Sequence, residues 1–131
     1  MIKSFPELWM KTVCTRSVPA VLSLYRHNAV LLATYNADIL QGHNQLRSYF
    51  QRFLGNEGLC GRIDSVVEQD FGNVKVLSGI YTFNFYEAGI PQTVKARYTF
   101  VLTPEDIRTG HIWASDKRWR IVTHHSSVVP E

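Results

Sequence analysis

Apolar residues recur at helical spacing in three stretches of the first half of the chain. The first follows an S-x-x-E capping box at 4–7, the second follows Ser17, and the third and clearest covers 46–54. The residues that share a helical face are Leu8, Trp9, Thr12 and Val13; Val18, Val21, Leu24 and Tyr25; and Leu46, Tyr49, Phe50, Phe53 and Leu54. Residues 29–36, AVLLATYN, fit either a strand or a buried extended link. Three N-terminal helices are therefore expected.

After the third helical stretch the period of the pattern changes from about 3.6 to about 2. Four stretches fit strands: 62–71, 74–86, 93–103 and 118–127. Gly72-Asn73 and the EAGIP segment at 87–91 fit turns between the first three strands, and residues 104–117 interrupt the last connection. Helices followed by antiparallel strands predict an α+β fold with the helices on one face of the sheet. We find no internal repeat and no linker, so residues 1–131 are expected to form a single domain.

The predicted strands carry bulky residues on both faces. In strand 74–86, one face holds Tyr81, Phe83 and Phe85, and the other holds Ile80, Thr82 and Tyr86. In strand 93–103, one face holds Val94, Ala96, Tyr98, Phe100 and Leu102, and the other holds Lys95, Arg97, Thr99 and Val101. One face can cover the helices, while the other leaves an apolar patch unless a second subunit covers it. The pattern predicts a homo-oligomer that forms through the sheet; scattered exposed aromatic residues are the alternative.

Composition narrows the class of protein. Apolar residues make up 45% of the chain, which favours folding over disorder, and the net charge of +3 is spread without a basic block, so nucleic-acid binding is not expected. No stretch is long and apolar enough for a membrane span or a signal peptide. Cys14 and Cys60 show no C-x-x-C spacing, so reduced thiols in a cytoplasmic protein are the expectation.

The closing HHSS segment is the first candidate for chemistry. Neighbouring residues of a strand point to opposite faces, so His124 and His125 cannot both bind one metal ion in a regular strand. We expect one histidine to face the core or a pocket and the other to face outward. No metal site, cofactor site or G-x-S-x-G nucleophile is implied, and Ser126 and Ser127 fit the polar end of a strand.

Arg97 is the second candidate, because it lies in the middle of a predicted strand. A buried cation there needs a partner, so Arg97 either lies at a subunit interface, pairs with a carboxylate, or presents its planar guanidinium to an anionic ligand in a cavity. Asp38, Asp64 and Glu87 are possible partners or bases, and their spacing selects none of them.

Three segments resemble a known family: GIYTF at 79–83, KARYTFV at 95–101 and WRIVTHHSSVVPE at 119–131, which carries a W-x-x-V-x-x-H-x-S-x-x-P pattern. They are similar to bacterial nuclear transport factor 2-like proteins of the SnoaL-like branch, which contains the association domain of calcium/calmodulin-dependent protein kinase II. The resemblance implies a cone of three N-terminal helices set against a strongly curved antiparallel sheet, with an internal cavity. It also implies a homodimer through the sheet and, as in the kinase hub domains, assembly into larger rings.

The resemblance also implies site residues. Arg97 matches a pocket arginine of the hub domains, His125 matches the histidine before the closing Ser-x-x-Pro, and Tyr81 replaces a second pocket arginine. The segment 104–117 is longer than the turn usual in such proteins. The implied ligand is a small acidic or polar molecule bound through Arg97, with Tyr81 and His125 in the same cavity.

Three functions stay open from the sequence. The first is an oligomer-forming domain that binds this small molecule. The second is an acid–base enzyme of isomerase, dehydratase or cyclase type, with His125 or Asp38 as its base. The third is a purely structural assembly module. The sequence contains no kinase motifs and does not favour catalysis. We therefore prefer the first function, an oligomer-forming domain that binds a small molecule.

Overall fold

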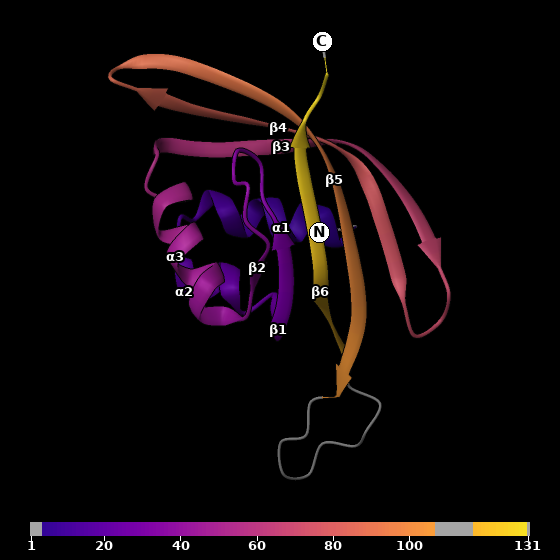
Figure 1. The fold of residues 1–131 in the computed structure, drawn as a ribbon. Helices are drawn as coiled ribbons and strands as arrows, with labels where there is room; N and C mark the ends of the chain where they lie inside the picture. Colours follow the sequence, from indigo (N-terminus) through magenta and orange to yellow (C-terminus); the bar gives the residue numbers. More distant parts are fainter. Residues whose placement is uncertain (1–3, 107–116, 131) are drawn as a thin grey trace.

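Residues 4–106 and 117–130 are described by a computed structural model of the chain. The helices and strands in chain order are α1 (Phe5–Cys14), α2 (Val18–Leu22), β1 (Tyr25–Leu32), β2 (Leu40–Gln41), α3 (His43–Phe53), β3 (Glu57–Asp70), β4 (Lys75–Glu87), β5 (Ile90–Asp106) and β6 (Lys117–Val128). The three helices lie together on one side of a sheet that bends over them (Figure 1). This arrangement agrees with the α+β fold predicted from the order of periodicities. The predicted interruption at 104–117 falls largely outside the described residues.

Local capping explains where the first two helices begin. The Ser4 hydroxyl accepts a hydrogen bond from the Glu7 amide at the start of α1, and the Ser17 hydroxyl accepts one from the Ala20 amide at the start of α2. Both starts confirm the sequence prediction. The end of α2 differs, because Tyr25 opens β1 and does not extend the helix. The Ile121 amide donates to the Leu24 carbonyl at 2.8 Å, so pairing with β6 overrides the local helical period.

The described residues form one six-stranded sheet in the order β2-β1-β6-β5-β4-β3. Strands β3 to β6 pair as antiparallel neighbours, as the sequence predicted. Strand β1 pairs parallel with β6, so the sheet is mixed, and the expectation of a wholly antiparallel sheet was wrong at this pairing. The cause is long-range: the chain leaves β1, forms α3 and the meander, and returns beside β1 in the same direction. Periodicity along the chain carries no information about that return.

Strand β3 departs from regular pairing with β4 between Ile63 and Ser65, and an irregularity of this kind bends a strand. At this point the Tyr98 hydroxyl reaches across from β5 and donates to the Ser65 carbonyl at 2.8 Å. Gly79 of β4 leaves room for this contact, since a Cβ there would overlap with both the Ser65 carbonyl and the Tyr98 hydroxyl. The bend therefore depends on a residue without a side chain at position 79.

The core fills the space between α1 and the inner face of the sheet. Trp9 of α1 is 1% exposed and stacks on Tyr81 of β4, with 5.4 Å between ring centroids. Phe100 of β5 lies at the same centroid distance from Trp9 on another side. One predicted face of strand 93–103 turns toward this core: Ala96, Tyr98, Phe100 and Leu102 are buried, and Val94 on the same face is partly buried. The alternation in strand 93–103 therefore grouped the core-facing residues correctly, and the structure shows which of the two faces is the inner one.

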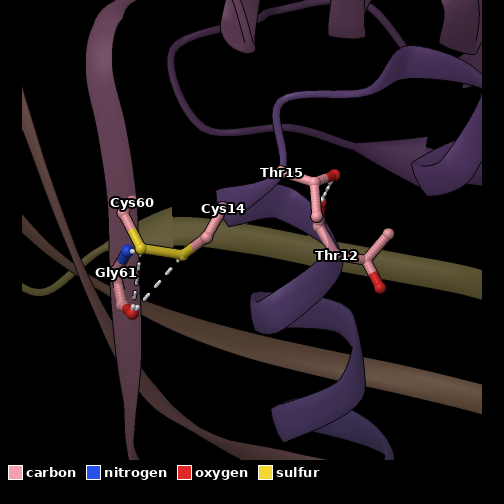
Figure 2. Close-up of a disulfide and its surroundings, with 5 residues drawn as sticks. All are labelled: Thr12, Cys14, Thr15, Cys60 and Gly61. Atoms are coloured by element: carbon pink, nitrogen blue, oxygen red, sulfur yellow. Dashed lines mark hydrogen bonds between the residues drawn. A yellow bond between two sulfur atoms is a disulfide. The ribbon is translucent and has the colours of Figure 1, made fainter.

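Cys14 and Cys60 form a disulfide between the C-terminal end of α1 and the start of β3 (Figure 2). Their Cα atoms are 4.4 Å apart although 46 positions separate them in the chain. The expectation of reduced thiols was wrong, because the sequence spacing does not reveal that the end of α1 packs on β3. The cytoplasmic location rested on reduced thiols and loses that support.

No helix within the described ranges is long and apolar enough to cross a membrane.

Candidate functional site

A pocket of about 330 Å³ opens between α3, the segment after β1 and the inner face of the sheet. Its walls are largely aromatic and apolar, with rings from α1, α3 and β4. Tyr49 and Phe53 of α3 line it on one side, and Phe83 and Phe85 of β4 line it on another. A pocket of this size with apolar walls and a few polar groups is typical of small-molecule sites.

His124 lies at the base of this pocket between two tyrosine hydroxyls. Its Nδ1 atom is 2.8 Å from the Tyr25 hydroxyl oxygen, and its Nε2 atom is 3.2 Å from the Tyr81 hydroxyl oxygen. The indole Nε1 of Trp9 donates to the Tyr25 hydroxyl at 3.0 Å. All four side chains are buried, so each of these hydrogen bonds replaces one that the polar group would make to water in the unfolded chain.

The chain of hydrogen bonds continues from Tyr81 toward the pocket. The Tyr81 hydroxyl donates to the Ser126 hydroxyl at 2.6 Å, and the Ser126 and Thr34 hydroxyls are also 2.6 Å apart. Ser126 and Thr34 both line the pocket. The buried polar chain (Trp9, Tyr25, His124, Tyr81, Ser126 and Thr34) therefore runs from the core to the pocket wall.

The polar chain is uncharged at neutral pH. Burial lowers the pKa of His124 to about 3, and the neighbouring charge of His125 adds to the effect. Burial also raises the pKa of Tyr25 and Tyr81 well above the ordinary value for tyrosine. An imidazole with such a low pKa and with both ring nitrogens hydrogen-bonded is a poor general base. The arrangement is suited to hydrogen bonding with a ligand.

The three predicted site residues do not share a cavity. Tyr81 lines the aromatic pocket, whereas Arg97 and His125 are exposed on the opposite face of the sheet. The expectation that they meet in one cavity was wrong because of strand alternation: Arg97 lies between the inward-facing Ala96 and Tyr98. Arg97 and His125 instead border a shallow hollow of about 420 Å³ on the outer face.

One histidine of the pair faces inward, as predicted, but it is His124. The resemblance selected His125 from its place before the closing Ser-x-x-Pro. The pairing of Phe100 with His124 places His124 beside a core-facing ring, whose centroid lies 4.3 Å from that of the imidazole. That register is the signal that selects His124, and it becomes visible only when β5 and β6 are paired. Sequence reasoning also missed Trp9, Ser126 and Thr34 as groups of one polar chain.

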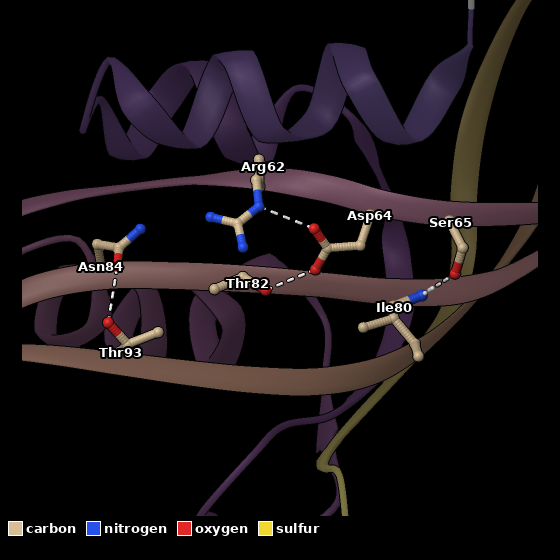
Figure 3. Close-up of polar contacts among 7 residues, drawn as sticks. All are labelled: Arg62, Asp64, Ser65, Ile80, Thr82, Asn84 and Thr93. Atoms are coloured by element: carbon tan, nitrogen blue, oxygen red, sulfur yellow. Dashed lines mark hydrogen bonds and ion pairs between the residues drawn. The ribbon is translucent and has the colours of Figure 1, made fainter.

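The three candidate carboxylates have different surroundings. Asp64 accepts a hydrogen bond from Thr82 at 2.5 Å and pairs with Arg62 at 2.8 Å (Figure 3). The hydrogen bond from Thr82 holds the pKa of Asp64 below its usual value, with Arg62 adding to the effect. Asp38 is exposed, and Glu87 is an exposed residue of the pocket lining. Asp64 therefore has a structural role, and the geometry assigns no carboxylate to the polar chain.

In the described ranges, no group of three or more His, Cys, Asp or Glu side chains is placed to hold a metal ion.

Comparisons with known proteins agree with this architecture. Residues 2–130 match the model of the calcium/calmodulin dependent protein kinase II association domain family. A solved structure from Xanthomonas campestris, whose name gives it as a candidate association domain of that kinase, is 30% identical with a TM-score of 0.80. That match covers 95% of this chain and 82% of the Xanthomonas chain.

More distant structures share the fold. A ketosteroid isomerase-like protein from Erwinia carotovora atroseptica is 15% identical with a TM-score of 0.70, covering 94% of this chain and 89% of the other. A nuclear transport factor 2-like superfamily protein from Salmonella enterica is also 15% identical, with a TM-score of 0.75 and coverage of 94% and 84%. The comparison with curated proteins gave no match. The chain therefore has the nuclear transport factor 2-like fold and belongs to the calcium/calmodulin dependent protein kinase II association domain family.

Proposed function

We propose that this protein is an oligomer-forming domain whose aromatic pocket binds a small polar molecule without converting it. The observation that carries the proposal is the buried polar chain that ends at Ser126 and Thr34 on the pocket wall. Buried polar groups are costly to retain unless they are paired, and here they are paired up to the point where the pocket begins. A ligand that completes the chain would gain both a hydrogen bond and aromatic contact.

The role of Arg97 changes under this proposal. Its exposed place on the outer face removes it from the aromatic pocket, and within the described residues it has no ion-pair partner. Ile80 of β4 pairs with Arg97 in register and borders the same hollow, and Val67 of β3 is 65% exposed beside them. An outer face with apolar and cationic residues together fits the subunit interface that the two-sided strands predicted.

The acid–base enzyme is the weaker reading. An enzyme of that type needs a base with a pKa near the working pH within reach of its substrate. His124 is the imidazole in the pocket, but its low pKa and its two tyrosine partners oppose proton abstraction at neutral pH. Glu87 is exposed and does not join the polar chain.

Filling the pocket is expected to abolish ligand binding. Val94 lines the pocket and is only partly buried, so Val94→Trp would fill the space without removing a core contact. We expect a small-molecule screen by thermal shift to give ligands that raise the melting temperature of the native protein by several degrees and leave Val94→Trp unchanged. Arg97→Ala, on the opposite face, is the matched control and should respond as the native protein does. If Arg97→Ala lost the increase in melting temperature, the ligand would bind at Arg97 and not in the aromatic pocket. A screen in which no compound raised the melting temperature would count against the proposal.

A charge in the outer hollow is expected to separate the subunits. Ile80→Lys adds a second cation beside Arg97, and a change at a hot-spot residue near the centre of an interface costs about 2 kcal/mol or more of association. We expect sedimentation to give a dimer or a larger species for the native protein and a clear shift toward monomer for Ile80→Lys. Ile90→Lys, at an exposed position outside the hollow, is the control with the same change of charge. A native protein that is monomeric at micromolar concentration would rule out the interface.

A further inference from the structure

The direction of the hydrogen bonds in the polar chain is fixed at its buried end. The Trp9 indole can only donate a hydrogen bond, so the Tyr25 oxygen accepts from it. The Tyr25 hydroxyl is buried, and in the described structure His124 Nδ1 is its other side-chain partner. Leaving the Tyr25 hydrogen without an acceptor in the core would be unfavourable. Tyr25 therefore donates to Nδ1, and Nδ1 carries no hydrogen.

This assignment sets the tautomer of His124. A neutral imidazole carries one hydrogen, and with Nδ1 accepting, that hydrogen lies on Nε2. Nε2 then donates to the Tyr81 oxygen at 3.2 Å, and Tyr81 donates in turn to Ser126 at 2.6 Å. Each group thus accepts from the buried side and donates toward the pocket.

The polar chain ends with a surplus hydrogen at the pocket wall. If Ser126 donates to Thr34, the Thr34 hydrogen is left over; if Thr34 donates to Ser126, the Ser126 hydrogen is left over. Neither hydroxyl has a further side-chain or backbone acceptor within the described part of the chain. Both residues line the pocket, so in either arrangement the pocket presents a hydrogen-bond donor at this point.

The charge of the pocket limits what this donor can meet. Among the described lining residues, Glu87 is the side chain that is charged at neutral pH, and none is a cation. An anionic ligand would lose its hydration without gaining an opposite charge, and it would meet Glu87 at the exposed part of the lining. A cationic ligand would meet the donor hydrogen of Thr34 or Ser126 at the pocket wall. An uncharged ligand with an acceptor oxygen incurs neither cost.

We infer that the pocket takes an uncharged, largely aromatic molecule with a hydrogen-bond acceptor, such as a ketone carbonyl, which accepts from the Thr34 or Ser126 hydroxyl. This inference rests on the proposed function and names the chemical class of its ligand. The resemblance implied an acidic or polar ligand bound through Arg97, and this inference differs from it in the site and in excluding an acidic ligand.

Three naphthalenes of nearly the same shape test the ligand class. 2-Acetylnaphthalene carries the acceptor, 2-isopropenylnaphthalene replaces its oxygen by carbon, and 2-naphthoate replaces the methyl ketone by an anion. Calorimetric titration of the native protein is expected to give tighter binding for the ketone than for the hydrocarbon by a factor of about two to ten, which is the net effect of one hydrogen bond. The ketone is also expected to bind more tightly than 2-naphthoate, because the anion loses its hydration without gaining an opposite charge. Val94→Trp is expected to bind none of them.

The outcomes separate the inference from the function on which it rests. Equal or tighter binding of 2-naphthoate, or equal binding of the ketone and the hydrocarbon, would overturn the inferred ligand class while the pocket remained a binding site. Absence of binding by all three would overturn both.

Nitrogen-15 NMR of the imidazole ring gives a second test that needs no ligand. We expect the hydrogen of His124 on Nε2, seen as a protonated Nε2 shift and an unprotonated Nδ1 shift at neutral pH. A hydrogen on Nδ1 would reverse the polar chain and overturn the inferred donor.

Discussion

Reducing the Cys14–Cys60 disulfide is expected to lower the free energy of unfolding by about 4 kcal/mol. The bond closes a loop across 46 positions, and in the chain-entropy account a loop of that length restricts the unfolded chain by roughly this amount. Such a loss is a large part of the free energy of unfolding of a typical domain, which is roughly 5–15 kcal/mol. Urea unfolding with and without dithiothreitol measures it directly.

The double variant Cys14→Ala with Cys60→Ala provides the control for the reductant. It should be destabilised to a similar extent as the reduced protein and should not respond to dithiothreitol. Cys60 is exposed, so its replacement leaves no cavity, and Cys14 is only partly buried. Two free thiols in the native protein purified without reductant, together with identical unfolding curves, would contradict the disulfide.

The disulfide also matters for the pocket, because it ties the end of α1 to β3. The same helix carries Trp9, which fixes the direction of the polar chain. Loosening α1 is therefore expected to disturb the hydrogen bond between Trp9 and Tyr25, at the buried end of the polar chain, before it disturbs Ser126 and Thr34 at the pocket wall.

Much of the fold could be predicted because the responsible interactions are local. Ser4 and Ser17 cap helices within three residues of themselves, and the alternation in β5 separates Tyr98 from Arg97 without any knowledge of their neighbours. The turn at Gly72-Asn73 likewise depends on the residues that form it, and it lies between β3 and β4 as predicted. These features need no contact between distant parts of the chain.

Long-range pairing accounts for the errors in the fold. The parallel pairing of β1 with β6 and the approach of Cys14 to Cys60 join segments that no local pattern connects. Tyr25 illustrates the conflict, since it fits the helical face of the preceding stretch and yet forms the first residue of a strand. In both cases tertiary contacts outweigh a weak local preference.

The site errors arise from a single-residue choice on a strand. Because side chains alternate, selecting His125 in place of His124 moves the predicted imidazole from the pocket to the outer face. The resemblance likewise placed Arg97 in the pocket. The alternation along the strand puts Arg97 on the face opposite to Ala96 and Tyr98, which are the core-facing residues. Alternation read from the residues was the more reliable guide to the pocket.

The stability of the protein is expected to fall by about 3 kcal/mol between pH 7 and pH 4 through His124 alone. The pKa of this buried imidazole is about 3 in the folded protein and about 6.5 in the unfolded chain. The unfolded chain therefore binds a proton below pH 6.5 that the folded protein resists, and stability is lost progressively as the pH falls from 6.5 toward 3. Above pH 6.5 both states are neutral at this position, and the contribution is fully present.

His124→Gln isolates this contribution from other groups that titrate in acid. We expect the variant protein to be less stable than the native protein at neutral pH, because glutamine replaces a ring that is hydrogen-bonded to two tyrosines. The glutamine side chain does not titrate in this pH range. The difference in unfolding free energy between the native protein and the variant should therefore narrow as the pH falls from 6.5 to 4. Parallel stability curves over that range would contradict a buried neutral imidazole. Proton NMR of the native protein tests the same point without a variant. If the His124 ring titrated near pH 6, it could not be buried between Tyr25 and Tyr81 as the structure shows.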